Sequence, residues 1–194
     1  MFIWAGAGVA SAALVSEVNV EGNQEVVTKH ILGAVRTKVG DTLDQEQVKE
    51  DVEAIYDLGF FSFADARFNP SSGGVAVTIV VKQKPIFESL NFEVNTVYND
   101  EHLNELVFTA PGTVFNRVFF RHDLRRIKEK YDDDGYVMMK IADVQIEQGN
   151  INVSILEPKI GDVIIQGNTK TKSFVIERQI KFEKGDLFNA TILR

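Results

Sequence analysis

The 194-residue sequence contains no cysteine. The chain therefore cannot form disulfides, cysteine-ligated zinc sites or a catalytic thiolate. A cysteine-free composition suits an oxidising compartment as well as the cytosol, so it leaves the location open. Basic residues are also in deficit, because 21 Lys and Arg stand against 28 Asp and Glu, for a net charge of −7. Such a chain lacks the basic footprint of a nucleic-acid-binding protein, and we expect no nucleic-acid partner.

A long apolar run is also missing. Only residues 1–15 are free of charge over such a length, and they fall short of the ~20 apolar residues that a membrane-spanning helix needs. They suit the apolar part of a secretory signal, with Ala10-Ser11-Ala12 as a small-residue cleavage site. A buried or tag-like N-terminal segment is the alternative. We therefore set residues 1–14 apart as a signal-peptide remnant or N-terminal extension.

A repeat organises the rest of the chain. The motif VNVEGN at residues 18–23 aligns with LNFEVN at 90–95 and VIIQGN at 163–168, at spacings of 72 and 73 residues. A second landmark keeps the same phase, with VGDTLD at 39–44, PGTVFN at 111–116 and KGDLFN at 184–189. Two independent landmarks at one period indicate tandem units. We predict two complete units, residues 15–84 and 85–158, and a partial third, residues 159–194.

The hydrophobic pattern of each complete unit predicts strand, helix, helix, strand, strand. In the first unit Val18 and Val20 alternate as in a half-buried strand. Asn23 is a candidate N-cap for a first helix that buries Val27 and Ile31.

The second helix is capped by Asp44 in the first unit and by Asn116 in the second, and it ends at Gly59 or Gly135. The two strands that follow are expected at 64–69 and 75–81, and at 138–146 and 151–156.

The continuous apolar run at 75–81 is typical of a central strand. The strand before it alternates with polar residues, which suits an edge. Two helices can cover one face of such a sheet, so we predict an α+β fold.

This repeat resembles the polypeptide-transport-associated (POTRA) domain of the BamA superfamily of outer-membrane assembly factors. The motifs that carry the resemblance are VNVEGN at 18–23, GDTL at 40–43 and LGFF at 58–61, with GY at 135–136 and IIQGN at 164–168. The resemblance covers residues 15–194 and implies tandem β-α-α-β-β units. The second unit departs from the pattern at Val94, where the turn normally has glycine.

The resemblance also implies a function. Domains of this family precede a membrane β-barrel and help to insert other barrels into the outer membrane. It therefore implies a non-enzymatic, cofactor-free scaffold at the periplasmic face of the bacterial outer membrane. Its partners would be unfolded outer-membrane proteins, accessory assembly proteins, and the membrane through a C-terminal β-barrel absent from this chain. A two-partner secretion transporter and a cell-division or adhesion scaffold without a barrel are the alternatives.

The residues themselves indicate neither a catalytic nor a metal site. His30, His102 and His122 are scattered, and the acidic run at 132–135 lacks the spacing of a calcium loop. An exposed edge strand can instead add an extended strand from another chain through its backbone groups. An ordinary solvent-exposed edge is the alternative. The predicted client-binding residues are Ala64, Asp65, Ala66, Arg67 and Phe68, and Met139, Lys140, Ile141, Ala142 and Asp143.

The second helix of the second unit is locally basic. Arg117, Arg121 and Arg125 are candidates for contact with anionic lipid headgroups or an acidic partner. A solvated helix face is the alternative.

Overall fold

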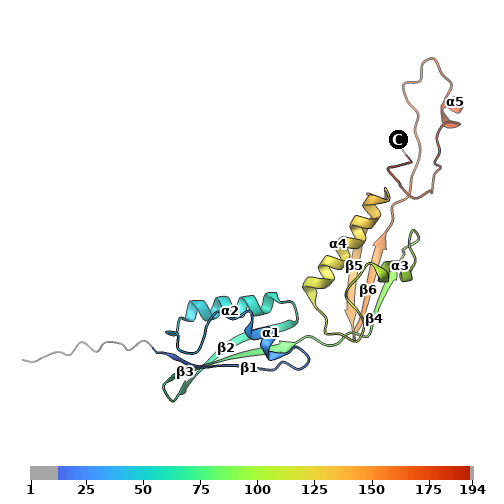
Figure 1. Cartoon of the computed structure of the whole chain (residues 1–194). Helices are drawn as coiled ribbons and strands as arrows, with labels where there is room; N and C mark the ends of the chain where they lie inside the picture. Colours follow the sequence, from blue (N-terminus) through green and yellow to red (C-terminus); the bar gives the residue numbers. More distant parts are fainter. Residues whose placement is uncertain (1–12, 193–194) are drawn as a thin grey trace, which may run out of the picture. The chain divides into compact units, whose positions relative to one another are not determined.

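The computed structural model describes residues 13–192 (Figure 1). The predicted signal segment therefore lies almost entirely outside the described residues. The chain divides into two compact units between Lys84 and Pro85. The first contains β1 (Val15–Glu21), α1 (Thr28–Leu32), α2 (Gln45–Asp57), β2 (Phe61–Ser71) and β3 (Gly74–Gln83). This is the predicted order of elements.

The sheet of the first unit has the strand order β1-β3-β2. β3 pairs in parallel with β1 and antiparallel with β2, which confirms its predicted central place. Both helices lie on one face of this sheet (Figure 1). The core joins the helical residues Ile31, Val48 and Ile55 to Val77 and Ile79 of β3.

The two predicted helix caps of this unit had different outcomes. Asp44 caps α2 as expected, since its Oδ1 accepts hydrogen bonds from the backbone N–H groups two and three residues on, at 3.0 and 3.3 Å. The prediction for Asn23 was wrong. Its amide donates to the Val26 carbonyl at 2.8 Å, and α1 begins only at Thr28. Because the helix starts late, Val27 is 64% exposed instead of buried.

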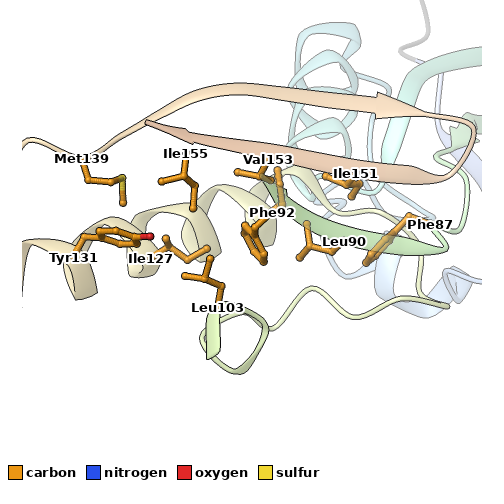
Figure 2. Close-up of a cluster of buried hydrophobic side chains, with 11 residues drawn as sticks. Phe87, Leu90, Phe92, Leu103, Ile127, Tyr131, Met139, Ile151, Val153 and Ile155 are labelled. Carbon is orange, nitrogen blue, oxygen red and sulfur yellow. The ribbon is translucent and has the colours of Figure 1, made fainter. Parts of the chain in front are cut away.

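The second unit repeats the first. It contains β4 (Ser89–Glu93), α3 (Asp100–Glu105), α4 (Arg117–Asp133), β5 (Lys140–Glu147) and β6 (Asn150–Leu156), with strand order β4-β6-β5. Figure 2 shows its core, in which the helical side chains meet the strands. Its members include Leu90, Phe92, Leu103, Ile127, Tyr131, Met139, Ile151, Val153 and Ile155.

The segment after β6 begins like the other two units. A bridge joins Lys159 to Leu187, as Leu14 joins Thr42 and Ile86 joins Val114. Within residues 157–192 the structure describes one helix, α5 (Ser173–Glu177). The third unit stays a prediction, because the compact division of the chain includes this segment in residues 85–194.

A buried aspartate holds the long helix to the preceding loop in both complete units. Asp51 of α2 is fully buried and accepts hydrogen bonds from the backbone N–H groups of Arg36 and Thr37, each at 2.9 Å. Asp123 of α4 does the same for Phe108 and Thr109, also at 2.9 Å. The two carboxylates are 72 residues apart and fix the structural alignment of the two helices.

Candidate functional site

The predicted client-binding residues of the first unit all lie on β2, an edge strand of its sheet. The sheet order leaves the outer side of β2 unpaired among the residues that the structure describes. The outer side of β1 is different, because loop residues cover its start. The Val15 N–H donates to the Asp41 carbonyl and the Gly40 N–H to the Val15 carbonyl, both at 2.8 Å. β2 is therefore the more accessible edge at this end.

The direction of the β2 amides follows from β3. The Val75 N–H donates to the Leu14 carbonyl at 2.8 Å, on the β1 side, so it is turned away from its β2 partner Pro70. In an antiparallel pair, bonded and non-bonded positions alternate, and the register is continuous over residues 63–71. Ala64, Ala66 and Phe68 share the phase of Pro70. Their N–H groups consequently point out of the sheet.

Not every outward position can receive a strand. The Ala66 N–H donates to Asp65 Oδ1 at 2.8 Å. Pro70 has no N–H group at all. The outward donors that remain open in this part of β2 are those of Ala64 and Phe68. Asp65, predicted as part of the binding edge, thus occupies one of its amides.

The corresponding edge of the second unit, β5, is more disrupted. Ala142 lies at a register irregularity, because Ile141 pairs with Ile155 while Asp143 pairs with Ser154. Such a bulge interrupts the ladder that an added strand would extend. Lys140, Ile141, Ala142 and Asp143 lie on β5, but Met139 precedes it and is 2% exposed. The structure thus places Met139 outside the edge strand, with its side chain in the core and its N–H donating to the Tyr136 carbonyl at 3.0 Å.

Beyond the bulge, β5 has a backbone N–H that is bonded to the preceding aspartate, as the Ala66 N–H is in β2. The Val144 N–H donates to Asp143 Oδ1 at 2.8 Å. Glu147 and Asn150 flank a two-residue turn and form a hydrogen-bonded pair. Because bonded and non-bonded positions alternate along the strand, the N–H groups of Val144 and Ile146 point out of the sheet. Between the bulge and the turn, only the Ile146 N–H remains available to an added strand.

The predicted arginines share one helix. Arg117, Arg121 and Arg125 lie on α4, where Arg121 and Arg125 are exposed and Arg117 is half-buried. The two exposed arginines have no acidic side chain within ion-pair distance among the residues described.

Two further features are absent from the described residues. Within residues 13–192 no group of three or more His, Asp or Glu side chains is placed to hold a metal ion. The same residues include no helix with the length and hydrophobicity to cross a membrane.

Known proteins support the resemblance. Two proteins named outer membrane protein assembly factor BamA are similar in sequence. The one from Nitratidesulfovibrio vulgaris is 22% identical over 75% of this chain and 19% of its own length. The one from Neisseria meningitidis is 23% identical over 93% of this chain and 24% of its own length. The chain thus spans about a fifth to a quarter of these relatives.

Solved structures show the same fold. The N-terminal domain of Omp85 from Thermosynechococcus elongatus has a TM-score of 0.74 and 24% identity, covering 93% of this chain and 81% of that one. POTRA1-3 of the periplasmic domain of Omp85 from Anabaena has a TM-score of 0.65 and 23% identity, covering 93% and 80%.

The match to a family model is the most direct. The model named POTRA, described as "Surface antigen variable number repeat", matches residues 13–84, 85–157 and 158–194 in succession. Because these matches cover nearly the whole sequence, the chain belongs to the POTRA family.

Proposed function

We propose that this chain is the periplasmic scaffold and client-binding module of an outer-membrane β-barrel assembly factor. It receives unfolded barrel proteins by β-strand addition. Sequence similarity to proteins named BamA supports the assembly role. The relative described as a periplasmic domain supports the location. In this proposal accessory assembly proteins act beside it, and a C-terminal β-barrel outside this chain connects it to the membrane.

The outer edge of β2 is the observation that carries the proposal. It offers the outward amides of Ala64 and Phe68, four residues apart on one continuous stretch of ladder. Backbone pairing gives affinity with little dependence on side chains, which suits a receiver of many different clients. The interrupted edge of β5 offers fewer open donors between its bulge and its turn. We therefore assign the primary client site to β2.

Proline substitution tests this assignment in the full chain. Phe68→Pro removes an open outward N–H, and β2 already accommodates a proline at position 70. The loss of one backbone hydrogen bond, about 1 kcal/mol, should weaken binding about fivefold. The probe is a fluorescent peptide from the terminal strand of an outer-membrane porin, with affinity read by anisotropy.

Two controls accompany this measurement. Phe68→Ala removes the side chain but keeps the N–H, and Arg67→Ala changes an exposed side chain of the same strand; both should bind nearly as the native chain does. Circular dichroism checks that each variant is folded. Equal affinity of a folded Phe68→Pro variant and the native chain would contradict strand addition at this edge.

A further inference from the structure

The long helices of the two units occupy the same place in the fold but carry opposite charge. Asp51 and Asp123 align α2 with the first thirteen residues of α4. The α2 stretch, Gln45–Asp57, has five acidic residues and one lysine, for a net charge of −4. The aligned residues 117–129 have five basic and two acidic residues, for a net charge of +3. Since the acidic helix supports the same fold, folding does not require the basic one.

One pair of aligned positions shows the change most clearly. In the first unit Arg36 forms an ion pair with Glu50 of α2. The equivalents in the second unit are Phe108 and His122, 72 residues further on. Phe108 is 78% exposed, and the guanidinium carbon of Arg126 lies 4.3 Å from its ring centroid. The surface ion pair of the first unit thus corresponds, in the second unit, to an exposed aromatic ring stacked with an arginine.

Phe108, His122 and Arg126 border a groove, which we call the α4 groove. Its volume is about 540 Å³. It is lined by Phe108, Phe119, His122, Arg125, Arg126 and Glu129. Its lining combines aromatic rings with guanidinium groups, and both kinds of side chain are enriched in protein–protein interfaces.

Within residues 13–192, Arg125 and Arg126 form no ion pair, although Glu129 lines the same groove. Arg125 has no acidic side chain within ion-pair distance in the described part of the chain. The Nη1 atom of Arg126 is shielded from solvent and has no hydrogen-bond acceptor among the described residues. A shielded donor without an acceptor is costly, and a carboxylate is the acceptor that a guanidinium binds most strongly. The chemistry that would complete this surface is therefore an anion next to an apolar group.

We infer that the α4 groove binds an acidic segment of a partner protein. One apolar or aromatic side chain of that segment packs against Phe108 and Phe119, while neighbouring carboxylates pair with Arg125 and Arg126. We choose a peptide over a lipid surface because one short segment can bring a carboxylate and an apolar side chain together to the guanidinium groups and aromatic rings that line this groove. This site is separate from the β2 edge and does not depend on strand addition.

A defined peptide tests the inference on the full chain. The probe is a fluorescein-labelled peptide of glutamates flanking one central phenylalanine, and its affinity is measured by anisotropy. Phe108→Ala and Arg125→Glu should each weaken binding about tenfold, as expected for residues at the centre of an interface. Replacing the central phenylalanine of the peptide with alanine should weaken binding to the native chain similarly.

The matched control is Lys49→Glu, which makes the same charge change on the exposed face of α2 and should leave the affinity unchanged. Equal weakening by Lys49→Glu and Arg125→Glu would overturn the inference, because it would indicate only general charge attraction. So would absence of peptide binding, or equal binding of the peptide with central alanine. Binding to phosphatidylglycerol vesicles without peptide binding would assign the surface to lipid and also overturn it.

Discussion

The carboxylate of Asp65 accepts a hydrogen bond from the backbone N–H of the next residue, Ala66, at 2.8 Å. This N–H is one of those that point out of the sheet along β2. The second unit has the same arrangement on β5, where Asp143 accepts from Val144 at 2.8 Å. Unpaired sheet edges tend to pair with other chains. In each unit an aspartate therefore occupies an amide that an added strand would otherwise use.

Removal of this carboxylate should make β2 a better receiver. Asp65→Ala frees the Ala66 N–H, and one additional backbone hydrogen bond should raise the affinity for the porin peptide about fivefold. Asp65→Asn keeps an oxygen acceptor at the same place and should bind almost as the native chain does. This pair of variants separates the acceptor from the charge. If Asp65→Ala binds the porin peptide with unchanged affinity, the bond between Asp65 and the Ala66 N–H does not limit binding.

The core prediction concerns opposite sides of α2. Ile55 is fully buried against the sheet, so Ile55→Ala should lower the free energy of unfolding by about 2–5 kcal/mol. Glu53 is exposed on the same helix, and Glu53→Ala should change the free energy of unfolding by less than about 0.5 kcal/mol. Urea unfolding measures both. Similar losses for the two variants would contradict the orientation of the helix.

Val94 gives a prediction of increased stability. Its φ of 65° places a β-branched residue in the left-handed region, which glycine adopts without strain. Val94→Gly should therefore raise the free energy of unfolding by about 1 kcal/mol. The aligned Gly22 has a φ of 91°, and a Cβ there would come within 2.0 Å of the Val81 carbonyl oxygen. Gly22→Ala should consequently destabilise the first unit, and a gain in stability would contradict this geometry.

Glu157 gives a prediction about pH. Burial raises the pKa of its carboxyl, but hydrogen bonds from Thr96, Tyr131 and Val97 outweigh burial and lower the pKa below its ordinary value of 4.5. Tyr131 Oη donates to Oε1 at 2.7 Å and the Thr96 N–H to Oε2 at 2.8 Å. A lowered pKa means that the carboxylate stabilises the folded state above the unfolded-state pKa. This contribution is lost as the pH falls through the lower, folded-state pKa.

The variant Glu157→Gln tests this linkage. It should lower the free energy of unfolding at pH 7 by about 1–2 kcal/mol, because the amide group cannot accept every one of these bonds. The difference from the native chain should shrink as the pH falls below the ordinary carboxyl pKa. Urea unfolding across the acidic range measures it. A difference independent of pH would contradict the role of the charge.

Most of the fold was predictable because its determinants are local. Alternating Val18 and Val20 predict a strand, and Asp44 begins α2 because a side-chain cap acts within three residues. Asn23 failed as a cap for a physical reason. Its amide closes the loop onto the Val26 carbonyl, and an amide used as a donor in this way does not mark the helix start. The buried aspartates Asp51 and Asp123 were missed because each reads as one more charged residue on a polar helix.

The candidate site was less predictable, because its details depend on strand register. Polar alternation in residues 64–68 was enough to predict an edge. The outward direction of the Phe68 amide depends on how β3 also pairs with β1, which local sequence does not encode. The bulge at Ala142 likewise arises from pairing between β5 and β6. Met139 was assigned to the edge because its neighbours alternate as in a strand, although its side chain fills the core.

Amide hydrogen exchange at Phe68 and Ala64 tests strand addition to β2 most directly. Exchange of assigned amides in the full chain is followed by NMR, with and without a saturating concentration of the porin peptide. If the peptide pairs with the outer edge of β2, exchange should slow at both of these outward amides. It should change little at Arg67, whose N–H already points toward β3. Peptide binding that leaves exchange at Phe68 and Ala64 unchanged would contradict strand addition at this edge.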